Sequence, residues 1–155
     1  MLEDPRQNWS LRAAVESDAP WIAELRAGVM RPDLERLGRF DPDRVRQRFL
    51  SAFDPVVTRV VLVEGQEAGS IAVRPDEGSL WIEHFYLGAD YQGRGIGSLV
   101  LQRELDARQD DHPFRLNVLQ GSRAQALYER HGFVVESQDA VDVFMVRPAG
   151  SANRN

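Results

Sequence analysis

The sequence predicts a single domain of the α/β (α+β) class, and three features of the chain indicate it. Hydrophobic residues make up 43% and charged residues 28% of the 155 residues, which is ordinary globular usage. Three runs rich in β-branched and aromatic residues, joined by short turns, predict an antiparallel meander over 58–87. Apolar residues at helical spacing precede and follow that meander. We therefore expect one domain over 1–155, with loose termini at 1–9 and 148–155.

The segment before the meander predicts one strand and then helices. Ser17 or Asp18 can cap a helix that Gly28 and Pro32 are expected to end. Asp41 and Pro42 are expected to begin a later helix with apolar residues on one side. The strand is expected over 10–15, and a short intermediate helix over 33–37.

The remaining elements are predicted from the spacing of apolar residues and from residues typical of turns. Strands are expected over 58–64, 68–74, 79–87, 114–119, 133–136 and 141–146. Helices are expected over 95–110 and 122–130. Gly132 is expected to end the second of these helices in the left-handed conformation, and the last two strands are expected to form a hairpin.

Composition excludes several classes of function. The sequence has no cysteine and only three scattered histidines, so we expect no disulfide and no metal site. The formal net charge of −5 disfavours nucleic acid as a partner. No apolar run is long enough to cross a bilayer, and the first residues lack the order of a signal peptide, so a cytoplasmic protein is expected.

A glycine-rich segment directly before a predicted helix is the strongest functional feature. Gly93, Gly95 and Gly97 occupy alternate positions there. Glycine permits positive φ and leaves room for backbone N–H groups to converge on an anion at a helix N-terminus. The segment therefore predicts a phosphate-binding loop.

Two nucleotide-binding alternatives fit this loop poorly. Gly93, Gly95 and Ser98 approach the dinucleotide-binding pattern, but that pattern opens a parallel βαβ unit, and here the loop follows an antiparallel meander. A Walker A loop requires lysine, which the sequence lacks.

Two motifs resemble those of the GNAT superfamily of N-acetyltransferases. Gln92-Gly93-Arg94-Gly95-Ile96-Gly97 is similar to the family's Q/R-x-x-G-x-G/A pyrophosphate loop. Leu116–Leu119 and the segment Ala124–Phe133 are similar to its A-x-x-L-Y-x-x-x-G-F region and the strand before it. The resemblance implies a mostly antiparallel mixed sheet, flanked by helices, that splays open where acetyl-coenzyme A enters. The chain departs from the family in lacking proline at 88–90 and in having Ser122 where asparagine is common.

The resemblance also implies a set of coenzyme contacts. Backbone amides from Gln92 to Ser98 are expected to bind the pyrophosphate. Backbone groups near Tyr86 and Leu87 are expected to bind the pantetheine arm, and an amide near Leu87 is expected to face the thioester oxygen. The full expected set is Tyr86, Leu87, Gln92, Gly93, Arg94, Gly95, Ile96, Gly97, Ser98, Asn117, Ser122 and Tyr128.

Tyr128 and Glu83 are the expected catalytic residues. Tyr128 matches the family's tyrosine, which can protonate the departing thiolate; the alternative is a tyrosine that only packs. Glu83, in a strand of mostly apolar residues, is the expected general base; the alternative is a structural ion pair. His84 is the next candidate for the base.

We therefore expect an acetyl-coenzyme A-dependent N-acetyltransferase that acts on a primary amine of a small molecule or a peptide. A catalytically silent acyl-coenzyme A-binding sensor or interaction module, and transfer of a longer acyl group, remain open alternatives. Acceptor contacts are expected from 19–53 and from the last hairpin. Arg31, Arg39 and Phe40 are candidates for an anionic or aromatic acceptor, and the alternative for the two arginines is a solvent-exposed role. A homodimer that forms through the final strand is also open.

Overall fold

The computed structural model describes residues 8–108 and 111–151, which form two compact units. The first unit comprises residues 8–72 and 84–100, and the second comprises residues 73–83, 101–108 and 111–151. The predicted loose ends at 1–7 and 152–155, and residues 109–110 of the helix predicted over 95–110, lie outside the described residues. That helix already ends at Asp106, so its predicted end is wrong.

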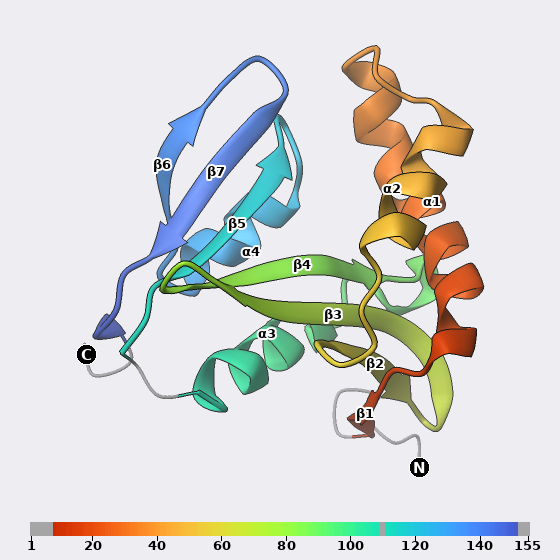
Figure 1. Cartoon of the computed structure of the whole chain (residues 1–155), viewed down its shortest axis with the longest axis horizontal. Helices are drawn as coiled ribbons and strands as arrows, with labels where there is room; N and C mark the ends of the chain where they lie inside the picture. The colour runs from red at the N-terminus through yellow and green to blue at the C-terminus, as the bar shows by residue number, and fades with distance from the viewer. Residues whose placement is uncertain (1–7, 109–110, 152–155) are drawn as a thin grey trace. The chain divides into compact units, whose positions relative to one another are not determined.

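Within the described residues, seven strands form one mixed sheet in the order β1-β2-β3-β4-β5-β7-β6 (Figure 1). The strands are β1 Trp9–Ala13, β2 Thr58–Val63, β3 Gln66–Asp76, β4 Ser79–Leu87, β5 Phe114–Leu119, β6 Val134–Gln138 and β7 Asp142–Arg147. The helices are α1 Ala19–Arg36, α2 Pro42–Ala52, α3 Ile96–Asp106 and α4 Ala124–Arg130, with short 3-10 turns at Glu16–Asp18 and Ala89–Tyr91. The predicted class, a mostly antiparallel mixed sheet flanked by helices, is confirmed.

In the first unit, β1 pairs with β2 and β2 with β3, both antiparallel. Glu64 and Gly65 join β2 to β3, and both have positive φ (52° and 77°), as a tight hairpin turn requires. Helices α1 and α2 lie side by side (Figure 1). Their core includes Ile22, Phe49 and the β4 residue Tyr86, all buried.

The prediction that Gly28 and Pro32 end the first helix is wrong. Helix α1 continues through both residues to Arg36, so residues 33–36 of the short helix predicted over 33–37 belong to α1. Residues on both sides of Gly28 are held by packing, because buried Ala27 and partly buried Val29 both lie in this core region. That burial outweighs the low helix propensity of glycine and proline.

Helices α1 and α2 differ in how they are capped. Helix α2 begins at Pro42 as predicted, and the carboxylate of Asp41 caps it by accepting hydrogen bonds from the backbone N–H groups of Asp43 and Arg44, each 3.0 Å. Asp18 stands at the start of α1, but its side chain makes no capping hydrogen bond to that helix. It is held instead by neighbours that lie before the helix and on its first turn.

In the second unit, β4 and β5 begin in parallel, with Leu80 opposite Phe114 and Trp81 opposite Arg115. Strand β7 pairs antiparallel with β5 on one side and with β6 on the other. The final strand is therefore interior to the sheet, and β6 is the edge on this side. The open possibility of a dimer through the final strand assumed that this strand is an edge, and that assumption is wrong.

Helix α3 carries one further correction. Its sequence predicts a broad apolar stripe in which Ile96, Leu99, Val100, Leu101 and Leu105 are all buried. Four of these five residues are buried, but Leu99 is 39% exposed. The apolar stripe of α3 is therefore narrower than its sequence indicated. Within the described ranges, no helix has the length and apolar character that crossing a membrane would need.

Candidate functional site

The glycine loop in the first unit has the backbone conformation that its sequence predicts. Gly93 and Gly95 both have left-handed φ, at 75° and 79°. Helix α3 begins at Ile96, and Leu99 N–H in its first turn donates to Gly95 O at 3.3 Å. Left-handed residues that alternate along a chain orient successive N–H groups toward a common point, which the helix N-terminus reinforces. The loop can therefore hold an anion.

Space around the loop fits such a ligand. A Cβ atom added at Gly93 would meet no other atom within 4 Å, so the backbone there is open. The side chain of Arg94 is exposed. Gln92 links the loop to the end of β4, because its side-chain Nε2 donates a hydrogen bond of 2.7 Å to Leu87 O.

The backbone N–H and C=O groups of successive residues at the end of β4 point to opposite edges of the strand. Ser70 Oγ donates to His84 O (2.8 Å), and Gly88 N–H donates to Ala68 O (2.8 Å), so both of these β4-side groups face β3. Peptide groups alternate along a strand, which leaves the N–H and C=O of Leu87 on the edge away from β3. A donor at Leu87 is therefore directed away from the β3 ladder.

Glycine is required at position 69 of β3, where the strand lies against the backbone of Tyr86 in β4. A Cβ atom at Gly69 would lie 2.1 Å from Tyr86 O and 2.9 Å from Leu87 Cδ2, which is closer than atoms can approach. The absence of a side chain at Gly69 thus allows the end of β4 to lie against β3.

A polar cluster that the sequence did not reveal lies between α1 and β4. Arg26 Nη1 donates a 2.8 Å hydrogen bond to the hydroxyl of Tyr86 and lies 3.4 Å from His84 Nδ1. The same His84 nitrogen is 3.3 Å from the Tyr86 hydroxyl. Phe49 packs against His84 edge to face, with ring centroids 5.0 Å apart. These contacts join residues 58 and 60 positions apart, so sequence spacing gave no signal for them.

The backbone of His84 is strained. Its φ of 51° lies in the left-handed region although it sits inside β4, and such a conformation costs about 1 kcal/mol or more for a residue with a side chain. The contacts of its ring and its carbonyl hold it there. Strain of this kind concentrates at functional sites.

Tyr128 in the second unit is 6% exposed and lies near the end of α4. Its ring packs against Phe133 with centroids 5.6 Å apart. Phe133 N–H donates to Tyr128 O, and Gly132 has the predicted left-handed φ of 91°. The helix end that carries Tyr128 is therefore fixed by its own backbone.

Glu83 forms an ion pair in the second unit. Arg74 Nε donates to Glu83 Oε1 at 2.5 Å, and Arg74 Nη1 to Asp76 Oδ2 at 3.2 Å. The hydrogen bond to Glu83 is the main cause that raises the pKa of Arg74. The ion pair foreseen as the alternative role of Glu83 is therefore present.

The other expected coenzyme contacts of the second unit have local partners. Asn117 Nδ2 donates to Asp142 Oδ1 at 3.1 Å, and Asn117 is exposed. Ser122 Oγ accepts a hydrogen bond from Ala124 N–H at 3.2 Å, just before α4.

The structure therefore groups the expected site residues in two sets. The first unit holds Tyr86, Leu87, Gln92, Gly93, Arg94, Gly95, Ile96, Gly97 and Ser98. The second holds Glu83, Asn117, Ser122 and Tyr128. In residues 8–108 and 111–151, no three histidines or carboxylates are placed to hold a metal ion.

Arg31 has a surface role. It pairs with Glu35 at 2.7 Å one turn along α1, and its guanidinium lies 4.8 Å from the centroid of the Phe40 ring. Both Arg31 and Arg39 are exposed.

A family model described as an acetyltransferase (GNAT) domain matches residues 55–135, which is more than half of the chain. The chain therefore belongs to the GNAT acetyltransferase family. No curated protein matches the sequence significantly.

Solved structures share the fold. A PaiA N-acetyltransferase from Thermoplasma acidophilum, in complex with coenzyme A, is 14% identical with a TM-score of 0.70, over 90% of this chain and 98% of that one. A ribosomal-protein alanine N-acetyltransferase from Escherichia coli is 17% identical (TM-score 0.68; 95% and 97% covered). A spermidine N-acetyltransferase chimera that includes Vibrio cholerae sequence is 20% identical (TM-score 0.68; 95% and 99% covered). At these sequence identities, the similarity shows a shared fold only.

Proposed function

We propose that this protein is an acetyl-coenzyme A-dependent N-acetyltransferase that acts on a primary amine of a small molecule or a peptide. The observation that carries the proposal is the pair of left-handed glycines, Gly93 and Gly95, immediately before α3 within the matched family region. Relatives of the same fold include enzymes named for amine acceptors and one bound to coenzyme A. Because the family match crosses both compact units, we treat residues 1–155 as one acetyltransferase domain.

Acetyl-coenzyme A would supply an acetyl group activated as a thioester. The amides from Gln92 to Ser98 would bind its pyrophosphate, with Arg94 adding a charge-assisted contact. The Leu87 N–H, on the edge of β4 away from β3, would donate to the thioester oxygen. Asn117, Ser122 and the backbone at Tyr86 would contact the pantetheine arm, as the family resemblance implies.

Two side chains would move protons. The hydroxyl of Tyr128 would protonate the thiolate that departs, a role that depends on its fixed position because its phenol is a weaker acid than a thiol. Glu83 would remove a proton from the attacking amine, directly or through water, which requires that it act from within its pair with Arg74. His84 is the alternative base.

A pH–rate profile separates the two candidate bases. If Glu83 is the base, Glu83→Gln removes the acidic limb of the kcat/KM profile, whereas His84→Gln leaves that limb in place. An unaltered acidic limb in Glu83→Gln would exclude Glu83 and leave the Arg74 pair as its role.

A thiol-release assay tests the function itself. Acetyl-coenzyme A is combined with small amines, polyamines, amino acids, aminoglycosides and peptides, and longer acyl-coenzyme A donors are run in parallel. Thiol release that depends on an amine supports the proposal, and the preferred donor identifies the acyl group. Binding of acetyl-coenzyme A without thiol release from any amine would instead identify a silent coenzyme-binding module. The pairing of Glu83 with Arg74 is the observation that keeps this second candidate in view.

A further inference from the structure

The guanidinium of Arg26 is a half-buried cation without a counter-ion in the described part of the chain. Its contacts are a phenol, Tyr86, and an imidazole, His84. Its Nε is buried and has no hydrogen-bond partner. A charge removed from water is costly unless an opposite charge or a full set of hydrogen bonds accompanies it. The protein alone does not complete this site.

The guanidinium of Arg26 uses only one of its two terminal nitrogens. Tyr86 and His84 both lie against Nη1, and Nη2 makes no hydrogen bond to a described residue, whereas Nε is buried. A carboxylate oxygen that accepts from Nη2 would supply the missing negative charge. Tyr86 belongs to an apolar core cluster with Ile22 and Phe49, and because the polar cluster offers one cation, a single negative charge is favoured over a dianion.

The position of the cluster identifies which molecule carries the anion. Tyr86 contributes both the hydroxyl that binds Arg26 and the backbone next to Leu87, where the thioester is proposed to lie. The negative charges of the coenzyme are assigned to the glycine loop instead. An anion at Arg26 therefore belongs to the acceptor.

We propose that Arg26 binds the carboxylate of the acceptor, so that the substrate is a small molecule with both an amine and a carboxylate, of the amino acid class. His84 and Tyr86 act as positioning residues, since they hold Arg26 Nη1 and leave Nη2 to the ligand. The strained backbone at His84 fits this role. This inference rests on the proposed acetyl transfer.

The test compares amino acids with their own amides, which keep the amine and replace the carboxylate by a neutral group. The ratio of kcat/KM for acid over amide is measured by thiol release in the wild type, Arg26→Gln, Arg26→Lys and Arg36→Gln. Comparing ratios between variants cancels the different reactivity of the two amines. Arg36 is the matched control, because it is on the same helix and pairs with Asp33 on the surface.

We expect the ratio to fall about tenfold to a hundredfold in Arg26→Gln, the range for a charged hydrogen-bonded pair, and to recover in part in Arg26→Lys. Arg36→Gln should keep the wild-type ratio. An unchanged ratio in Arg26→Gln overturns the proposal while leaving acetyl transfer intact. So does a wild-type preference for phosphoethanolamine over the amino acids.

A binding measurement covers variants that fold poorly and the case in which no amine releases thiol. Calorimetry compares an N-acetyl amino acid with its amide, and circular dichroism first checks that each variant is folded. Tighter binding of the acid by wild type, lost in Arg26→Gln and partly kept in Arg26→Lys, supports the carboxylate site without any turnover. Equal affinities for acid and amide in the wild type overturn it.

Discussion

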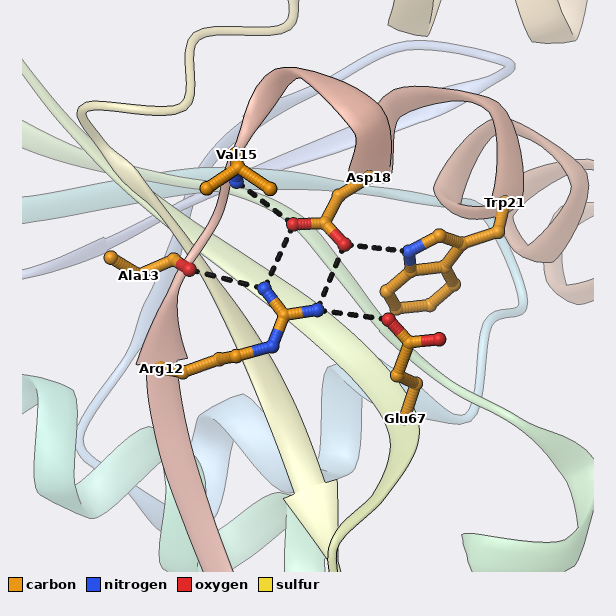
Figure 2. Close-up of polar contacts among 6 residues, drawn as sticks. All are labelled: Arg12, Ala13, Val15, Asp18, Trp21 and Glu67. Carbon is orange, nitrogen blue, oxygen red and sulfur yellow. Dashed lines mark hydrogen bonds and ion pairs between the residues drawn. The ribbon is translucent and has the colours of Figure 1, made fainter.

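The guanidinium of Arg12 makes two hydrogen bonds to the carboxylate of Asp18, each 2.9 Å, and this pair joins β1 to the start of α1 (Figure 2). Asp18 also accepts hydrogen bonds from Val15 N–H at 2.8 Å and Trp21 Nε1 at 2.9 Å. Arg12 extends the contact to Glu67 on β3 at 2.8 Å. The helix that carries Arg26 is thereby fixed to two strands of the first unit.

Loss of the Asp18 carboxylate should destabilise the protein. We expect Asp18→Ala to lower the free energy of unfolding by about 2–4 kcal/mol, because it leaves several donors without an acceptor. The cost stays below that of a fully buried pair, since the Arg12 side chain is 35% exposed and can be solvated. Urea denaturation at pH 7 measures the change. Asp33→Ala, which breaks a surface pair with Arg36, is the control and should cost less than about 1 kcal/mol; equal losses would contradict the account.

The same carboxylate predicts a pH dependence. The hydrogen bonds from Arg12, the largest cause, hold the pKa of Asp18 well below its usual range in the folded state. Its stabilisation is therefore complete above the unfolded pKa of about 3.9 and declines as the pH falls below that value. The stability difference between wild type and Asp18→Asn should shrink by about 1.4 kcal/mol per pH unit below pH 3.9. Urea midpoints between pH 5 and pH 2.5 measure it, and a constant difference would refute the assignment.

Gly69 and Gly28 should respond in opposite ways to alanine. A Cβ atom at Gly69 would collide with the backbone at Tyr86 O, so Gly69→Ala should lower the free energy of unfolding by more than about 2 kcal/mol. A Cβ atom at Gly28 meets nothing within 4 Å, and alanine is the better helix former there, so Gly28→Ala should add about 0.5–1 kcal/mol. Denaturation of both variants decides, and a tolerated Gly69→Ala would mean that β3 and β4 do not approach so closely.

Tyr128→Phe tests the proposed acid. Removing the hydroxyl should lower kcat about a hundredfold, the typical contribution of a positioned proton donor, and leave the dissociation constant of acetyl-coenzyme A within about threefold. Steady-state kinetics and calorimetry together make the measurement. Unchanged turnover would reduce Tyr128 to its packing against Phe133.

Most of the fold follows from local sequence patterns. The predicted bounds of β4 and β5, 79–87 and 114–119, match the structure because turn residues flank apolar runs. The end of α1 was not predictable in this way, since Gly28 and Pro32 are local stop signals and the packing that overrides them comes from other elements. The position of β7 inside the sheet likewise depends on pairing with β5, which no local pattern encodes.

The candidate site likewise has one part that local sequence patterns predict and one part that they do not. The left-handed conformations at Gly93 and Gly95 were predictable because glycine spacing reports backbone geometry directly. The contacts of Arg26 were not predictable, because its sequence context does not distinguish it from the other, solvated arginines of the same polar helix. Its meeting with Tyr86, 60 residues away, follows from packing alone. The conformation of the glycine loop was therefore predictable from the sequence, whereas the polar cluster at Arg26 could be found only from the structure.

The central claim is that the loop from Gln92 to Ser98 holds acetyl-coenzyme A, and a matched pair of glycine variants tests it directly. Gly93 and Gly65 have nearly equal φ, 75° and 77°, and a Cβ atom at either would meet nothing within 4 Å. Alanine should therefore cost similar stability at both, about 1–2 kcal/mol. Calorimetric titration with acetyl-coenzyme A should show at least tenfold weaker binding for Gly93→Ala and wild-type binding for Gly65→Ala. Equal affinities of the two variants, or no binding by the wild type, would contradict the account.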